Sequence, residues 1–246
     1  MRQLILSHAN LTAAVLDPLL RTDAAAPRIT YYDDATAERI ELSTATLANW
    51  AAKTGNLLRD EFGAGPGSRV AVLLPAHWQT AAVLLGIWWI GAEVLLGGSE
   101  DADVVMCSED RIAEAGAIAG PAAELVVLSL DPFGRPVDNL PVGVTDYATS
   151  VRVHGDQLVA EPRPGPALDG RPVSVVLADA RNTAVRQQIS SKDRVMSSAD
   201  WDTYERMTST VLAVLATGAS LVHVNHPDGA ALERRRGTEK VTLVLD

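Results

Sequence analysis

The sequence is short of cysteine, lysine and aromatic residues. Its 246 residues include one cysteine, Cys107, three lysines, and aromatic side chains at a level of 4%. A single cysteine excludes an intrachain disulfide and any zinc site built from several thiolates. Because Cys107 follows the apolar run 104–106, we interpret it as a small buried hydrophobic residue.

Long apolar runs and positive charge are also scarce. The most apolar segment, 80–96, contains Glu93 and ends at a Gly-Gly pair, so no membrane span is predicted. The N-terminal apolar run is too short for a secretory signal, and a cytoplasmic location is expected. Acidic residues number 31 against 21 basic ones, which gives a net charge of -10. Since a phosphate backbone repels an acidic surface, no nucleic-acid partner is expected.

Short apolar runs alternate with helical patterns, and this predicts an α/β fold with mostly parallel sheets flanked by helices. The hydrophobic fraction of 47% is enough for a sizeable core. Strands are expected at 28–32, 39–42, 69–74, 93–96, 103–107, 125–130, 173–177, 194–196, 220–224 and 241–245. Helices are expected at 11–20, where Pro18 predicts a short or split helix, and at 44–62, 78–90, 112–119, 145–151 and 203–215.

Two features suggest how the chain is organised. The segment 161–172 is rich in proline and glycine, which favours a linker between lobes 1–160 and 173–246. Arg69-Val70 followed by Gly91-Ala92 matches Arg194-Val195 followed by Gly218-Ala219. This internal echo predicts two related β-α-β halves.

Most catalytic motifs are absent. No Gly-Lys dipeptide occurs, which excludes a phosphate-binding loop of the Gly-x-x-x-x-Gly-Lys type, and no Gly-x-Ser-x-Gly or His-Glu-x-x-His motif is present. His223 and His226 would point to opposite faces of a strand, so no metal site is expected there. We interpret the basic run 234–236 as a solvated helix face.

The most unusual stretch is Asp200-Trp201-Asp202-Thr203-Tyr204-Glu205. It follows an expected strand and opens an expected helix, which is where open α/β sheets place ligands. One hypothesis is that Trp201 and Tyr204 wall a pocket while Asp202 binds a cation or polar group. The alternative is structural: Asp200 or Asp202 caps the helix and Trp201 covers the core.

The order of elements resembles the start of the acyl-adenylate-forming (AMP-binding) enzymes, which include acyl-CoA ligases. The residues that carry this resemblance are Arg28-Ile29-Thr30-Tyr31, the helix that follows Ser43, Gly65-Pro66-Gly67-Ser68-Arg69-Val70 through Pro75, and Ile90-Gly91-Ala92. Asp193-Arg194-Val195 through Gly218-Ala219 resembles a later segment, where an aromatic-containing motif near Trp201-Asp202 helps to form the acyl or amino-acid pocket. More narrowly, the chain resembles a short actinobacterial-type group. The resemblance implies one AMP-binding-enzyme-like domain over 1–246, equivalent to part of the family's N-terminal domain.

The chain departs from this family in the motifs that carry out the family's reaction. The Ser/Thr/Gly-rich phosphate loop should lie in 173–183, which has no glycine and no lysine. The adenine-ribose motifs and the small C-terminal domain with its catalytic lysine are not matched either. Adenylation needs positioned donors, a lysine and Mg²⁺ around the α-phosphate. The resemblance therefore implies a relative without adenylation activity, with no catalytic residue and no cofactor.

Three hypotheses about function follow. In the first, the chain binds a small acyl or amino-acid ligand or a partner protein, with Asp200, Trp201, Asp202 and Tyr204 as ligand-binding residues. In the second, it is an acyl-CoA ligase-like enzyme completed by a second subunit, and only then are ATP with Mg²⁺ or CoA expected. In the third, it is a structural protein that forms a homodimer, with Trp78, Trp88 and Trp89 supplying an apolar interface.

Overall fold

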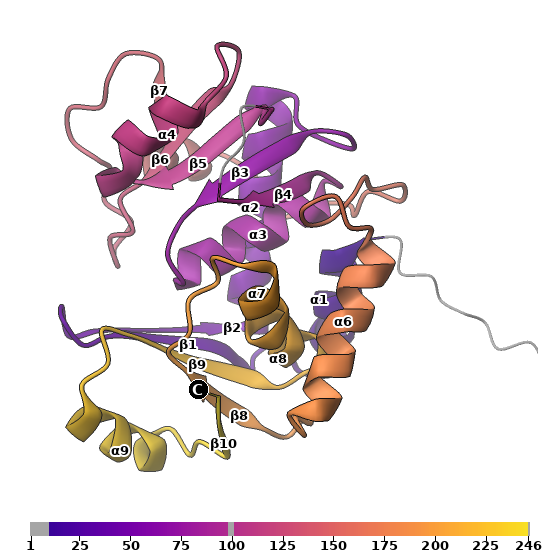
Figure 1. Cartoon of the computed structure of the whole chain (residues 1–246), viewed down its shortest axis with the longest axis vertical. Coiled ribbons are helices and arrows are strands. Elements are labelled where there is room, and N and C mark those ends of the chain that lie inside the picture. Colours follow the sequence, from indigo (N-terminus) through magenta and orange to yellow (C-terminus); the bar gives the residue numbers. More distant parts are fainter. Residues whose placement is uncertain (1–9, 98–100, 246) are drawn as a thin grey trace, which may run out of the picture.

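The computed structural model describes residues 10–97 and 101–245 and contains two five-stranded sheets (Figure 1). The first sheet has the order β10-β8-β9-β1-β2, and the second has the order β4-β3-β5-β6-β7. The strands are β1 (Pro27–Asp33), β2 (Glu38–Ser43), β3 (Arg69–Leu73), β4 (Glu93–Leu96), β5 (Val104–Ser108), β6 (Glu124–Leu128), β7 (Val144–Asp146), β8 (Arg194–Ser197), β9 (Ser220–Asn225) and β10 (Leu243–Leu245). Every described pairing is parallel except that of the β1–β2 hairpin, which confirms the expected fold class.

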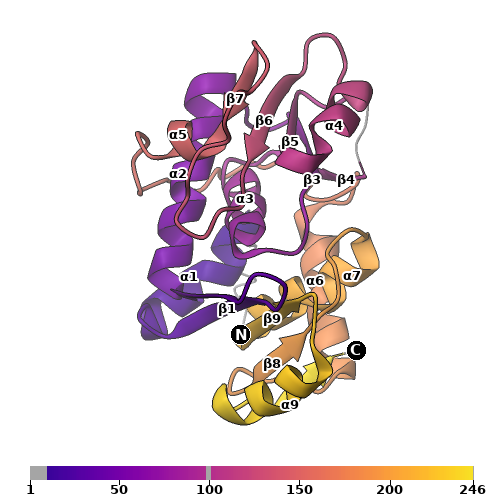
Figure 2. The same cartoon turned by 90° about the vertical axis from the view of Figure 1, so that its left-hand side faces the viewer.

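Helices separate and cover the sheets. They are α1 (Leu11–Asp23), α2 (Thr44–Phe62), α3 (Trp78–Trp89), α4 (Ile112–Ile118), α5 (Tyr147–Val151), α6 (Val173–Arg186), α7 (Tyr204–Ser209), α8 (Val211–Thr217) and α9 (Gly229–Thr238), with a 3-10 turn at Glu109–Arg111. The pair α2 and α3 contacts both sheets. Figures 1 and 2 show α4 on the second sheet in one half of the molecule and α9 beside the first sheet in the other. None of the described helices is long and apolar enough to cross a membrane.

Both faces of the inner strands of the sheets are buried, which explains the near-continuous apolar character of these strands. In β3, Val70 and Val72 face the central core, whereas Ala71 and Leu73 face a smaller core that also includes Ala115 of α4. Cys107 belongs to that smaller core and is buried, as predicted, and burial raises the pKa of its thiol to about 11. Alternate residues of one strand thus pack into different cores.

The internal echo corresponds to two β-α-β units with the same register. Arg69 pairs with Glu93 where β3 meets β4, and Arg194 pairs with Ser220 where β8 meets β9. The returning strand of each unit begins with a backbone bond of the same kind: Glu93 N–H donates to Ser68 O and Ser220 N–H donates to Asp193 O. The prediction of two related halves is confirmed.

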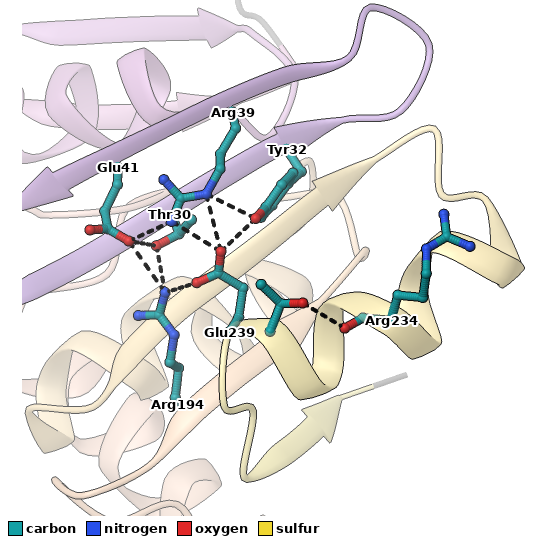
Figure 3. A network of polar contacts seen from close by, with 8 residues as sticks. Thr30, Tyr32, Arg39, Glu41, Arg194, Arg234 and Glu239 are labelled. Atoms are coloured by element: carbon teal, nitrogen blue, oxygen red, sulfur yellow. Dashed lines mark hydrogen bonds and ion pairs between the residues drawn. The ribbon is translucent and has the colours of Figure 1, made fainter.

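A buried carboxylate ties the end of α9 to the first sheet (Figure 3). Glu239 accepts hydrogen bonds from Tyr32, Arg194 and Arg39, the last with Nη2 3.0 Å from Oε1. Burial raises the pKa of Glu239, but these hydrogen bonds outweigh it and lower the pKa to about 2. Arg235 lies over the Tyr32 ring at 3.8 Å and pairs with Asp34, so the basic run is not simply a solvated face.

The strand expected at 173–177 is wrong: these residues begin the 14-residue helix α6. The side chains that α6 buries recur at helical spacing, namely Val173, Val176, Leu177, Ala180, Thr183 and Ala184. The short apolar run at its start resembles a buried strand, and only the full window separates the two possibilities. Pro172 precedes the helix, where its missing N–H costs no helical hydrogen bond.

Three other boundaries differ from the expectations. α1 is continuous over 13 residues because Pro18 lies on its exposed side while its apolar flank is buried. The helix expected at 203–215 is two helices, since Thr210 adopts φ -114° and ψ -96° between α7 and α8. The segment expected as a helix at 145–151 forms β7 before α5.

The tryptophans of α3 do not form an exposed surface. Trp78, Trp88 and Trp89 are all buried within the chain itself, and Trp88 Nε1 donates to Ala167 O at 2.7 Å. The interface suggested for Trp78, Trp88 and Trp89 is therefore wrong, because α3 is covered on every side by the chain's own elements. The homodimer itself stays a prediction.

The segment 161–172 is hydrogen-bonded to the turn between α3 and β4. Glu161 N–H donates to Trp89 O and Gly165 N–H donates to Gly91 O, at 3.0 and 2.9 Å. The first sheet takes β1 and β2 from before this segment and β8, β9 and β10 from after it. That 1–160 and 173–246 behave as separate lobes stays a prediction.

Two glycines let α2 and α3 approach to backbone contact. A Cβ atom on Gly86 would lie 2.8 Å from Ala51 O and 2.8 Å from Thr54 Cβ. A Cβ atom on Gly55 would lie 3.2 Å from Gly86 O. The helix pair that lies between the sheets therefore depends on the absence of side chains at this crossing.

We predict that Gly86→Ala lowers the free energy of unfolding by about 1–3 kcal/mol, because the added methyl group must push backbone atoms apart. Urea denaturation measures this change. The matched control is Gly116→Ala in α4, where a Cβ meets nothing within 4 Å. It should be neutral or stabilise by about 0.5–1 kcal/mol, since alanine favours the helix. Equal effects at the two positions would contradict the close crossing.

Candidate functional site

A cavity of about 1000 Å³ lies between the two sheets. Its walls come from the segments that follow β3, β5, β6, β8 and β9, together with the β1–β2 hairpin. The lining residues include Tyr31, Asp33, Glu38, Arg39, Pro75, His77, Asp110, Leu130, Pro132, Phe133, Ser198, Asp200, Asn225 and His226. In open parallel sheets, the carboxyl ends of the strands form the crevice that binds ligands, and here both sheets contribute such ends to one cavity.

Asn225 joins the two sheets at the floor of this cavity. Its Nδ2 donates to Ala76 O, after β3, and to the Tyr31 hydroxyl on β1, both at 3.1 Å. Because the amide nitrogen is fixed by Ala76 O, Oδ1 faces His223 Nε2 at 2.9 Å and accepts its proton. One side chain at the end of β9 thus holds strand ends of both sheets together.

His77 and Glu38 form a buried pair at the cavity wall. The Gln79 N–H donates to His77 Nδ1 at 3.2 Å, which places the ring proton on Nε2. This Nε2 lies 3.8 Å from Glu38 Oε1, too far for a hydrogen bond, and Oε1 is buried with no hydrogen-bond partner. Burial lowers the pKa of His77, and the Glu38 carboxylate offsets this only in part.

Contacts between rings continue inward from the cavity. Tyr31 packs edge-on against His77 at 4.3 Å, and Trp201 lies 5.3 Å from His223. His223 is buried, and burial lowers its pKa to about 4, so the ring is neutral at physiological pH. Burial also raises the pKa of Tyr31, with Asp33 and Glu38 adding to the effect, so its hydroxyl stays protonated.

The predicted site residues are dispersed rather than gathered around one ligand. Asp200 lines the cavity, whereas Trp201 is buried beneath it. Asp202 is exposed and pairs with Arg206 at 2.9 Å. Tyr204 donates to Asp179 at 2.7 Å and lies under the Arg171 guanidinium, in a separate surface pocket. Burial and Asp179 raise its pKa to about 12.

The cap expected at Asp200 or Asp202 is wrong, because Thr203 caps α7 by accepting from Arg206 N–H. The sequence interpretation also missed Tyr31, Glu38, His77 and Asn225. A signal was present, since Asn225 directly follows one expected strand and His77 lies three residues beyond the end of another. The rule about carboxyl ends, applied to every strand rather than to one, would have found them.

The chain is similar to proteins of known sequence and to proteins of known structure. A TIGR03089 family protein of Mycobacterium tuberculosis (strain ATCC 25618 / H37Rv) is 62% identical over 238 residues, covering 96% of this chain and 98% of that protein. The chain belongs to the TIGR03089 family. No family model matches the chain.

Solved structures similar to this TIGR03089 family member are adenylate-forming ligases. An acyl-CoA synthetase of Brucella canis matches 96% of the chain with a TM-score of 0.79 and 18% identity. The anthranilate CoA ligase AuaEII, in complex with anthranoyl-AMP, and a benzoate CoA ligase from Burkholderia xenovorans LB400 also match 96% of it, each with a TM-score of 0.74 and 16% identity. The chain spans 46–49% of the length of these three ligases. At this identity the likeness shows the fold: part of an acyl-CoA ligase N-terminal domain.

Because His223 is neutral when buried, we predict that the free energy of unfolding depends on pH. The pKa of His223 falls from 6.5 to about 4 on folding, so between these values the unfolded chain binds the proton more readily. The contribution of His223 to the free energy of unfolding is fully present above pH 6.5 and is lost as the pH falls toward 4. Between pH 7.5 and pH 5 this loss amounts to about 2 kcal/mol. Urea denaturation at the two pH values measures it.

His223→Gln should show a smaller loss between the two pH values, whatever its stability at pH 7.5. The matched control is His226→Gln, at the residue directly after β9, where the side chain is 68% exposed. It should keep the wild-type loss. The same loss in wild type and in His223→Gln would contradict a buried neutral imidazole.

Proposed function

We propose that the chain binds a small organic molecule carrying an ammonium or similar donor group, such as an amino acid, in the cavity between the sheets. The observation that carries this proposal is the excess of carboxylates in the lining. The lining contains four carboxylates and one guanidinium, that of Arg39. The carboxylates are those of Asp33, Glu38, Asp110 and Asp200. A cavity of about 1000 Å³ is large enough for such a molecule.

The carboxylates differ in how far the protein itself satisfies them. Asp33 accepts from Ala35 N–H and pairs with His226 at 3.0 Å. Asp110 and Asp200 are exposed at the cavity, and neither forms a hydrogen bond or close ion pair within the described part of the chain. These two carboxylates are therefore available to a bound cation or donor, and charges of one sign in a concave site favour a ligand of the opposite sign.

Arg39 does not offset this charge for an anionic ligand. Its Nη2 contacts Glu41 at 2.9 Å and Glu239 at 3.0 Å, so the guanidinium is already engaged by carboxylates. No lysine lines the cavity. A triphosphate needs several positioned cations, and this lining supplies none that is unpaired.

The absence of adenylation is the second part of the proposal. In the resembling family the phosphate loop would lie at 173–183, and in this chain that segment belongs to α6. Its backbone N–H groups, apart from those of the first turn, are used within the helix and cannot cradle a phosphate. The chain is therefore proposed to be an acyl-CoA-ligase-like relative that binds a ligand without activating it.

Thermal denaturation with matched ligands tests the proposal. Hexylamine and hexanoate have the same chain length and opposite charge, and amino acids, ATP with Mg²⁺, AMP and CoA complete the panel. An ammonium-bearing ligand at about 100 times its Kd should raise Tm by on the order of 5–10 °C, whereas hexanoate and ATP with Mg²⁺ should not. A shift with ATP and Mg²⁺, followed by pyrophosphate exchange, would overturn it.

The double substitution Asp110→Asn and Asp200→Asn should weaken binding of the effective amine or amino acid by about tenfold or more, since a charged hydrogen bond is worth about 1.5–3 kcal/mol. Isothermal titration calorimetry measures this loss. Glu124→Gln is the matched control. Glu124 is exposed at the amino end of β6, whereas Asp110 follows the carboxyl end of β5 in the same sheet. Unchanged affinity in the double variant would place the ligand elsewhere.

A further inference from the structure

A second pocket of about 320 Å³ adjoins the first and has the opposite charge. The two share Pro132 and Phe133 as a common wall. Trp50, Trp78, Lys53 and Arg152 complete the main lining, to which no carboxylate of the described residues contributes. In a chain of net charge -10, a pocket lined by two cations and no anion is a distinct chemical environment.

The walls of the second pocket are aromatic. Trp50 of α2 and Trp78, the first residue of α3, meet edge to face, with ring centroids 5.6 Å apart and an angle of 68° between the rings. Trp78 is buried and forms the floor, whereas Phe133 is 79% exposed at the rim. An exposed phenylalanine beside two indoles gives a flat apolar molecule surfaces to stack on.

The two cations retain unused hydrogen-bond donors. Lys53 Nζ donates to His154 O at 2.6 Å, which uses one of its three protons. Arg152 donates through Nη2 to the carbonyls of Phe133 and Gly134, which leaves its Nε–H and its other terminal nitrogen unused. Neither cation pairs with a carboxylate of residues 10–97 or 101–245. A carboxylate bound in this pocket would accept hydrogen bonds from these unused donors.

We propose that this pocket binds a planar aromatic carboxylate of one or two rings, with the ring against Trp50, Trp78 and Phe133 and the carboxylate at Lys53 and Arg152. The volume is at the lower end of the roughly 300–1000 Å³ usual for ligand pockets, which fits a molecule of this size. The proposal is independent of the ammonium ligand assigned to the larger cavity, because it rests on different side chains and the opposite charge.

Calorimetric titration with 1-naphthoate tests the proposal, with 1-naphthamide as its neutral isostere and cyclohexanecarboxylate as its non-aromatic counterpart. We expect saturable binding of naphthoate, and binding of each counterpart weaker by about tenfold or more, since each lacks either the charge or the planar ring. Naphthoate affinity should also fall with added salt. Equal affinity for naphthamide, or no saturable binding of naphthoate, would overturn the proposal.

Variants locate the binding. Lys53→Gln combined with Arg152→Gln should raise the Kd for naphthoate about tenfold, and so should Phe133→Ala at its exposed position. The matched control combines Arg163→Gln with Lys192→Gln, two exposed cations remote from the pocket lining, and should leave the Kd unchanged. Asp110→Asn with Asp200→Asn should not weaken naphthoate binding, which separates this site from the larger cavity. Loss in that variant but not in Lys53→Gln with Arg152→Gln would refute the assignment.

Discussion

The Asn225 amide forms hydrogen bonds to groups of both sheets. The rest of the candidate site depends on the position in which these hydrogen bonds hold the two sheets. Parallel sheets normally end at separate crevices, each at its own carboxyl edge. Here one amide reaches Ala76 O beyond β3 and the Tyr31 hydroxyl on β1, so the edges of both sheets meet. The same amide accepts the proton of His223 and so requires that imidazole to present Nε2–H. The larger cavity lies at this junction, with His77 in its wall and the buried, neutral His223 bonded to the same amide.

Two pockets of opposite charge share one loop wall at Pro132 and Phe133. The larger is acidic because the strand ends carry carboxylates whose charge the protein leaves mostly uncompensated. The smaller is basic because, within residues 10–97 and 101–245, Lys53 and Arg152 are bonded to carbonyl groups and to no carboxylate. The fold is that of part of an acyl-CoA ligase N-terminal domain, yet fold alone does not determine activity. We propose that the charges of these linings decide which molecules bind.

Much of the fold was predictable from local patterns. The β-α-β echo gave the right register because both halves use an Arg-Val strand start and a Gly turn before the returning strand. The strand predicted at 173–177 was wrong because a short run with four apolar residues out of five suits a strand as well as a buried helix turn. Of the predicted site residues, only Asp200 lines the candidate cavity, since the prediction rested on the unusual composition of the single segment 200–205. Tyr31, His77 and Asn225 become neighbours only when the sheets are assembled, and no local pattern encodes that contact.

Amide hydrogen exchange tests whether the cavity at the joined sheet edges binds a ligand. The exchange of every peptide is compared with and without a saturating amount of the amine or amino acid that raises Tm most. We predict protection in peptides covering 31–40, 75–79, 198–201 and 225–228, which include lining residues of the cavity. Protection confined to other regions, such as α6 or the outer face covered by α4, would contradict it.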